Sequence, residues 1–164
     1  MKIAFFGCGL IGEKRAAQLM GHELAGFYDP NQERAQGLAK KLNSKVFRSE
    51  DDLLKNSGCD VVVVATTNNQ LAPLTLKALQ NGKHVLVEKP GAIRVAELEA
   101  IHDLATKKNL AVKVGFNHRF HPALLKAREL IDSGALGPLM FLRARYGHGG
   151  RLGYEKEWRS IPEP

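Results

Sequence analysis

The chain has 164 residues, of which 44% are hydrophobic and 25% are charged, and these proportions are ordinary for one globular domain. The net charge is +7, but lysines and arginines are interleaved with acids, and no run of five or six basic residues occurs. We therefore expect a solvated basic surface and no nucleic-acid partner.

The two cysteines, Cys8 and Cys59, have neither the spacing of metal ligands nor that of a disulfide framework. We expect both to be buried free thiols in a reducing compartment, and we expect no metal site. No stretch reaches the roughly 18 apolar residues of a membrane span. The apolar N-terminus is broken by glycines and lacks a small-residue cleavage site, unlike a signal peptide. These features predict a cytoplasmic protein with no membrane partner.

Residues 1–12, MKIAFFGCGLIG, predict a strand, a glycine turn and the start of a helix. Lys2–Phe6 is the expected strand. Gly7 then permits a tight turn, and Gly9 removes the side chain where backbone would approach a pyrophosphate. Gly12 lets the helix pack closely on the strand. This arrangement is typical of a dinucleotide-binding turn, and a plain structural turn is the alternative.

The helix after this turn is expected from Glu13 onward. Its first N–H groups have no partner within the helix and would point at the phosphates of a cofactor. The residues predicted to bind the cofactor in this turn are Gly7, Gly9, Leu10, Ile11 and Gly12.

An acid at the end of the next strand completes this pattern. Glu23–Tyr28 is that expected strand, and Asp29 follows Gly12 by about 17 residues, near the usual spacing of about 20. Its carboxylate would accept hydrogen bonds from the adenosine ribose and repel a 2′-phosphate, which favours NAD over NADP. Arg34 could still reach a 2′-phosphate. Asp29 can also serve as part of the turn that starts the next helix.

Strand-like and helical patterns alternate through the first 120 residues. Asp60–Ala65 is a continuous, mostly β-branched run typical of a central parallel strand, and Pro73 is expected in the first turn of its helix. This alternation predicts an α/β fold: a Rossmann-type, doubly wound parallel sheet with helices on both faces. The other expected elements are a helix at 32–42, a short strand at 45–47, a helix after Ser49, a helix at 71–80, strands at 84–87 and 110–114, helices at 96–108 and 123–132, and a strand at 139–146.

Polar residues follow two of these strands, at the sheet edge where parallel α/β proteins bind ligands. Thr66 and Asn68 are expected to line a cofactor there, with ordinary turn chemistry as the alternative. Glu88, Lys89 and Pro90 follow the strand at 84–87. Lys89, desolvated beside a positive nicotinamide, would lose its proton more readily and could exchange a proton with a carbinol during hydride transfer. A Glu–Lys pair on the surface is the alternative, and Pro90 is a candidate for a cis peptide bond.

Four motifs occur in chain order: Gly7-x-Gly9-x-x-Gly12, Ala65-Thr66-x-Asn68, Gly82-Lys-His-Val-Leu-Val-Glu88-Lys89-Pro90 and Gly115-Phe-Asn-His-Arg119. In this combination the sequence resembles the Gfo/Idh/MocA oxidoreductases, which include glucose–fructose oxidoreductase and inositol dehydrogenase. The family pattern A-T-P-N-x-x-H differs at two positions, since Thr67 replaces the proline and Leu71 the histidine. The resemblance implies nicotinamide-dependent chemistry on a carbinol of a sugar, sugar acid, inositol or nucleotide sugar.

The resemblance also implies roles for individual residues. Lys89 is placed in the active site as the catalytic group, and it would contact the substrate together with His118 and Arg119. Glu88, Lys89 and Asn117 would contact the cofactor, NAD.

Family members carry a second domain with a mostly antiparallel sheet. Residues 1–120 would be the NAD-binding Rossmann domain, and residues 121–164 a connecting helix and the first strand of a truncated α+β substrate domain. We therefore expect this chain to bind the cofactor but to turn over poorly by itself. The full-length enzyme would form a homo-oligomer through the missing sheet. The alternatives are a non-catalytic NAD-binding sensor module and a methyltransferase that binds S-adenosylmethionine.

Overall fold

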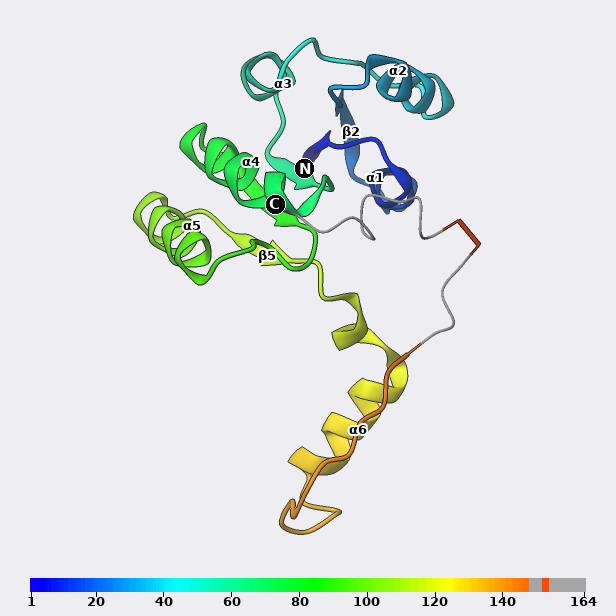
Figure 1. Ribbon diagram of the computed structural model, residues 1–164, viewed down its shortest axis with the longest axis vertical. Helices are drawn as coiled ribbons and strands as arrows, with labels where there is room; N and C mark the ends of the chain where they lie inside the picture. Colours follow the sequence, from blue (N-terminus) through cyan, green and yellow to red (C-terminus); the bar gives the residue numbers. More distant parts are fainter. Residues whose placement is uncertain (148–151, 154–164) are drawn as a thin grey trace. The chain divides into compact units, whose positions relative to one another are not determined.

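The computed structural model describes residues 1–147 and 152–153 (Figure 1). These residues divide into two compact units, the first ending at Asn117 and the second beginning at His118. The end of the expected substrate-domain segment, 121–164, lies outside the described residues.

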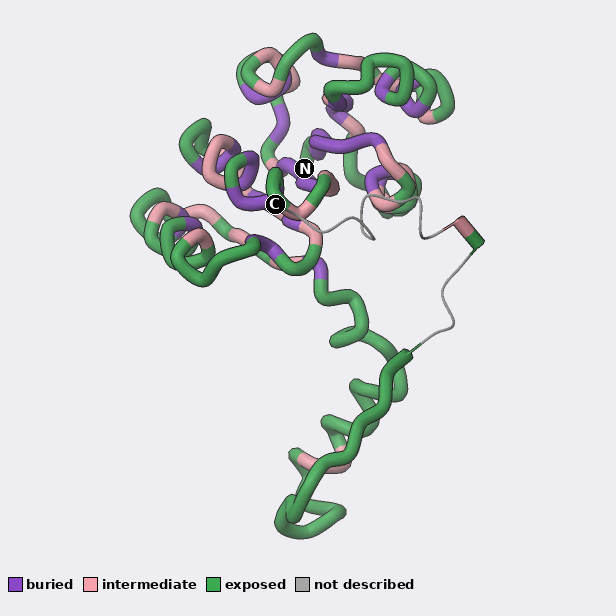
Figure 2. The backbone as a smooth tube through the Cα atoms, in the orientation of Figure 1, coloured by how far each residue is buried: buried purple, intermediate pink, exposed green. Residues whose placement is uncertain are grey.

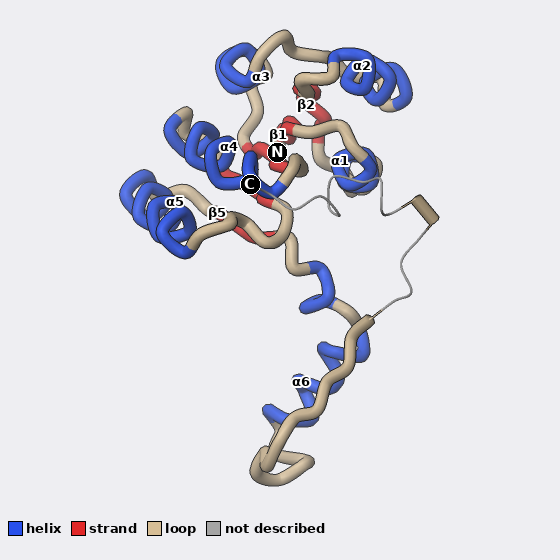
Figure 3. Tube along the Cα trace, in the orientation of Figure 1, coloured by secondary structure: helices blue, strands red, loops and turns tan. Residues whose placement is uncertain are grey.

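Five strands of the first unit, red in Figure 3, form one sheet. Every neighbouring pair of these strands is parallel. The order across the sheet is β2-β1-β3-β4-β5. The predicted Rossmann-type parallel sheet is therefore confirmed. After β1 the chain adds β2 on one side and then β3, β4 and β5 on the other, so the strand order reverses between β1 and β3. The strands are β1 Lys2–Phe6, β2 Glu23–Tyr28, β3 Val61–Val64, β4 His84–Val87 and β5 Val112–Val114.

The strand expected at 45–47 is reduced to a single bridge beside β2. Val46 pairs in parallel with Phe27, and the Phe27 N–H donates to the Lys45 carbonyl at 2.9 Å. The segment is too short to add a full ladder, because Ser49 already caps the next helix.

Five helices of the first unit connect or follow the strands: α1 Leu10–Ala16, α2 Gln32–Lys41, α3 Glu50–Asn56, α4 Asn68–Gln80 and α5 Val95–Lys108. Side chains cap the start of two of them. The Asn31 side-chain oxygen accepts from the Arg34 N–H at 2.9 Å, and the Ser49 hydroxyl accepts from the Asp52 N–H at 3.1 Å. The helix start expected at Ser49 is thus confirmed.

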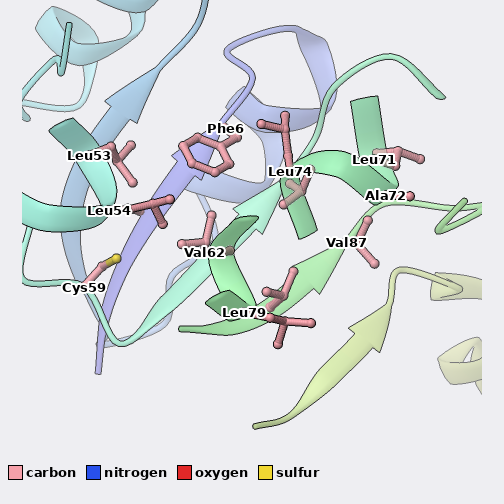
Figure 4. Packing of buried hydrophobic residues seen from close by; sticks show 14 of the residues in the cluster. Phe6, Leu53, Leu54, Cys59, Val62, Leu71, Ala72, Leu74, Leu79 and Val87 are labelled. Carbon is pink, nitrogen blue, oxygen red and sulfur yellow. The ribbon is translucent and has the colours of Figure 1, made fainter. Parts of the chain in front are cut away.

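Side chains of the strands alternate between the two faces of the sheet, because successive strand residues point to opposite sides. Phe6 of β1 and Val62 of β3 pack on one face with residues of α3, α4 and α5 (Figure 4). Phe5 of β1 and Val63 of β3 pack on the other face with residues of α1 and α2. Buried residues therefore follow the strands and the inner sides of the helices (Figure 2), and the β-branched run of β3 is covered on both faces.

The helix after β3 begins earlier than the sequence predicts. It starts at Asn68, so Pro73 lies in its second turn, and the expectation that Pro73 lies in the first turn is wrong. Thr67 has an extended backbone and is the N-cap, so the helix follows the strand almost directly. The proline removes a donor to the carbonyl of Asn69, but both residues are exposed, so water can satisfy that carbonyl.

The second unit contains α6, Pro122–Asp132, which follows a 3-10 turn at Asn117–Phe120 (Figure 1). No residue of α6 is buried. The strand expected at 139–146 is not formed, and Leu139–Leu142 are exposed, so this prediction is wrong for the described structure. A strand needs the backbone of a neighbour for its hydrogen bonds, and within residues 1–147 no strand pairs with this segment.

Candidate functional site

The residues that follow the strands gather at one edge of the sheet, because all five strands run in the same direction. The Gly7 N–H donates to the Tyr28 carbonyl at 2.9 Å, so the ends of β1 and β2 meet there. The Glu88 N–H donates to the Val64 carbonyl at 2.9 Å, which joins the ends of β4 and β3. The predicted site residues of the first unit therefore share this carboxyl edge.

Two close backbone approaches fix the glycine turn. Gly7 has a φ of +94°, and a Cβ added to it would lie 2.3 Å from the carbonyl oxygen of Ala65, just after β3. A Cβ on Gly12 would lie 2.1 Å from the Gly7 carbonyl oxygen. Since α1 begins at Leu10 rather than at Glu13, Gly12 is already inside the helix when it makes this approach. The packing of the chain itself thus requires both glycines.

Gly9 differs from these two glycines. Its φ is −74°, which any residue adopts, and an added Cβ would meet no protein atom within 4 Å. The fold of the described chain therefore does not require a glycine here. Leu10 and Ile11 begin α1, and first-turn N–H groups have no acceptor within a helix. A pyrophosphate on these N–H groups would occupy the space that a side chain at Gly9 would fill, so the turn fits a dinucleotide.

Asp29 is fixed between the glycine turn and the start of α2. The residue is 5% exposed, and its Oδ2 accepts from the Cys8 N–H at 2.8 Å. Its Oδ1 accepts from the Asn31 N–H at 2.8 Å, which confirms the turn role expected from the sequence. Each carboxylate oxygen has two lone pairs, so each retains one acceptor position for a ligand. The role of Asp29 at a ribose stays a prediction.

Cys8 lies inside the turn but is not a reactive group. Burial raises the pKa of the Cys8 thiol to about 12, and the Asp29 carboxylate adds to this rise while Arg34 opposes it. The thiol therefore stays protonated at neutral pH and is a poor nucleophile. Cys59 is also free and buried, so the prediction that both cysteines are buried free thiols is confirmed.

Lys89 follows β4, and its peptide bond to Pro90 is cis. The side chain is exposed at the open edge of the sheet. The described residues therefore leave Lys89 in contact with solvent, and its expected desolvation beside a nicotinamide stays a prediction. A group seated on this edge would have to provide it.

Arg15 of α1 joins the ends of β4 and β5. Its Nε and Nη2 both donate to Oε1 of Glu88, at 2.7 Å and 2.5 Å, and Nη2 also donates to Oδ1 of Asn117 at 2.7 Å. The Arg15 and Glu88 side chains are 26% and 12% exposed. Gly115 leaves room for this contact, because a Cβ there would lie 2.9 Å from Nη2.

The sequence interpretation did not select Arg15. A signal was available, because Arg15 stands three residues after Gly12 in a helix and therefore on the same face. Gly12 must face the strands in order to pack on them, so a charged side chain at this spacing points toward the strand ends.

Thr66 and Asn68 lie at the carboxyl edge of β3, and both are half-buried. The Thr66 hydroxyl donates to the Thr67 carbonyl at 3.4 Å, and Asn68 is the first residue of α4. Their contact with a cofactor stays a prediction. Leu71 is fully buried in the core, so the position that holds histidine in the family pattern does not face the edge.

His118 and Arg119 are exposed and belong to the second unit. The His118 ring lies edge-on to the Tyr146 ring, with centroids 5.3 Å apart. Their contact with a substrate stays a prediction.

Within residues 1–147 and 152–153, no three His, Cys, Asp or Glu residues form a group that could hold a metal ion. No helix in the same part of the chain has the length and apolar character needed to cross a membrane.

The fold and the glycine turn define a protein of the NAD-binding Rossmann class. A family model described as "Oxidoreductase family, NAD-binding Rossmann fold" matches residues 1–116. The chain belongs to this family, Gfo/Idh/MocA, as its motifs indicate.

Three known proteins illustrate the similarity. Glucose-6-phosphate 3-dehydrogenase of Bacillus subtilis is 32% identical over 162 residues, which cover 96% of this chain and 46% of that protein. UDP-N-acetylglucosamine 3-dehydrogenase from Acidithiobacillus ferrooxidans has a similar structure, with a TM-score of 0.75 and 32% identity over 79% of this chain and 42% of that one. Scyllo-inositol dehydrogenase from Lactobacillus casei, solved with NAD(H) and scyllo-inositol, has a TM-score of 0.78 and 25% identity over 84% and 42%. The chain thus spans less than half the length of these relatives.

The environment of Cys8 predicts slow alkylation in the folded protein. At pH 8 a thiol with a pKa of about 12 is ionised to roughly one part in 10⁴, against roughly a quarter for an ordinary cysteine. We expect iodoacetamide to leave Cys8 unmodified at pH 8 in native protein and to modify it in urea, as measured by mass spectrometry. Native labelling as fast as that in urea would contradict this account of the turn.

Proposed function

We propose that this chain is the cofactor-binding part of a nicotinamide-dependent dehydrogenase that acts on a carbinol of a sugar, sugar acid, inositol or nucleotide sugar. The observation that carries the nucleotide site is the open space beside Gly9, at a turn where Gly7 and Gly12 are both required by close packing. The substrate class is supported by the relatives, which are named for glucose 6-phosphate, UDP-N-acetylglucosamine and scyllo-inositol.

The arrangement of Asp29 supports NAD rather than NADP as the cofactor. Its carboxylate is buried and held by two backbone N–H groups, so it cannot turn away from a bound adenosine ribose. Ribose hydroxyls would donate to its remaining lone pairs, whereas a 2′-phosphate would be repelled by its charge. Arg34 lies on α2, where its backbone N–H donates to the Asn31 side chain and its own side chain is exposed. It therefore stands near Asp29 without a fixed role.

Each part of the edge has its own task in the reaction. The bound nicotinamide would supply the hydride acceptor or donor. The N–H groups of Leu10 and Ile11 would hold the phosphates, and Asp29 would orient the ribose. Lys89 would hold the substrate hydroxyl by its Nζ and take up or return the carbinol proton. With cofactor and substrate seated on the edge, Lys89 would lose contact with water.

We also propose a small-molecule partner rather than a nucleic acid, a cytoplasmic location and a homo-oligomeric state. Two buried free thiols support a reducing compartment. The exposed apolar side chains of 139–142 support an association with further protein surface, since large apolar side chains in sequence are usually covered.

The first prediction from this proposal concerns the cofactor. NAD or NADH near millimolar concentration should raise the melting temperature by several degrees, because a ligand that binds only the folded state stabilises it. NADP and NADPH should raise it less, because of Asp29. Gly9→Ala should fold normally but bind NADH about tenfold more weakly or worse, since the new methyl group takes space needed by the phosphates. Differential scanning fluorimetry and calorimetric titration would measure both effects.

Two glycine variants control this experiment. Gly37→Ala places a methyl group in open space on the exposed side of α2, away from the edge, and should leave NADH binding unchanged. Gly12→Ala should instead destabilise the fold, because its methyl group meets the Gly7 carbonyl. Stabilisation by S-adenosylmethionine alone, or undiminished NADH binding by Gly9→Ala, would overturn the proposal.

The second prediction concerns Lys89. Lys89→Met in the whole protein should lower kcat for oxidation of inositols or sugars by about 10²–10⁴-fold, because proton transfer loses its positioned group. NADH affinity should change far less than kcat. Lys107→Met, which replaces an exposed lysine of α5, should leave kcat unchanged. Steady-state assays that follow NADH absorbance would check this, and an unchanged kcat in Lys89→Met would exclude Lys89 as the catalytic group.

A further inference from the structure

The Arg15 guanidinium connects three segments that are far apart in the sequence. Arg15 lies on α1, directly after the glycine turn; Glu88 follows β4; and Asn117 follows β5. Gly115 packs against both charged groups, since an added Cβ would lie 2.9 Å from Nη2 of Arg15 and 3.1 Å from Oε1 of Glu88. The backbone at Gly115 thus lies directly against this side-chain contact.

The chemistry of this contact favours arginine over other cations. Nε and Nη2 reach the same Glu88 oxygen while Nη2 also reaches Asn117, so the planar fork of a guanidinium serves two partners. Hydrogen bonds between charged groups are stronger than neutral ones. The Glu88 side chain is only 12% exposed. Without Arg15, its negative charge would be mostly buried and would lose the cation that offsets the cost of that burial.

The position of this contact along the edge gives it a specific place at the cofactor. Asp29 follows β2, which lies on one side of β1, whereas Glu88 and Asn117 follow β4 and β5 on the other side. A dinucleotide with its adenosine ribose at Asp29 and its phosphates at the glycine turn would extend its other half toward Glu88 and Lys89. Arg15 therefore acts on one half of the cofactor site only.

We propose that Arg15 is a positioning residue for the nicotinamide half of the site. By holding Glu88 and Asn117, it fixes the Glu88-Lys89-Pro90 turn relative to α1 and thus relative to the phosphates. The side-chain hydrogen bonds of Arg15 go to Glu88 and Asn117 and not to Lys89, so the effect on Lys89 passes through the backbone beside Glu88. This inference rests on the proposed function, because it assumes that the edge binds a nicotinamide dinucleotide.

The test compares two ligands that differ only by the nicotinamide. ADP-ribose contains the adenosine, both phosphates and the second ribose, whereas NADH also carries the nicotinamide ring. In Arg15→Met, we expect NADH affinity to fall by about tenfold or more. The hydrogen bonds from Arg15 to Glu88 and Asn117 are lost, so the Glu88-Lys89-Pro90 turn is no longer fixed beside the nicotinamide. ADP-ribose affinity should stay within about twofold of that of the unaltered protein, since Asp29 and the glycine turn are untouched. Calorimetric titration would give both dissociation constants.

Three further variants sharpen this test. Arg15→Lys keeps a positive charge beside Glu88 but loses the planar fork, so it should show a smaller loss confined to NADH. It carries the test if Arg15→Met does not fold. Arg15→Met combined with Glu88→Gln should lose about as much binding free energy for NADH as the larger of the two single losses, and clearly less than their sum, because each acts through the same contact. Glu13→Gln removes the ion pair that α1 makes with Lys41 of α2 and is the matched control, with both affinities unchanged.

The outcomes separate this inference from the proposed function. If the unaltered protein binds neither NADH nor ADP-ribose, the proposed function fails, and the inference fails with it. If the unaltered protein binds both ligands but Arg15→Met weakens both equally, Arg15 is merely structural and the inference is wrong. Unchanged NADH binding in Arg15→Met overturns the inference as well, while the nucleotide site stands.

Discussion

The site depends on the close approach of backbone where β1 ends. A Cβ on Gly7 would collide with the Ala65 carbonyl, and one on Gly12 would collide with Gly7 itself. The turn, the start of α1 and the end of β3 can therefore come together only because these two positions lack side chains. This packing places the first N–H groups of α1 at the point between β1 and β3 where the order of the strands reverses. Parallel α/β sheets bind their ligands at this point.

The same edge is organised by charged side chains on either side of the turn. Asp29 accepts backbone N–H groups from both the turn and the start of α2. On the other side, Arg15 binds Glu88 and Asn117. In the proposed binding mode, one acid lies at the adenosine end of the cofactor and the other at the end where Lys89 stands. The helix that would hold the phosphates also carries the arginine that ties down the far side of the site.

Much of this arrangement could be predicted from the sequence, because the signals are local. The glycine spacing, the acid after β2 and the β-branched run of β3 each predict one feature from a few adjacent residues. Contacts between distant segments are not local. Arg15 meets Glu88 73 positions away, which spacing alone does not reveal. The segment at 139–146 has a strand-like pattern, but a strand also needs a neighbouring strand, and the pattern cannot supply one.

The central claim is that the turn from Gly7 to Gly12 holds the phosphates of NAD. Titration of the ¹⁵N-labelled protein with NAD, followed by amide NMR, tests this claim most directly. The account predicts the largest shifts at the amides of Gly9, Leu10 and Ile11, with smaller shifts beside Asp29 and Lys89. If the largest shifts occur instead around the hollow between α5 and β5, lined by residues that include His102 and Lys113, the claim is contradicted.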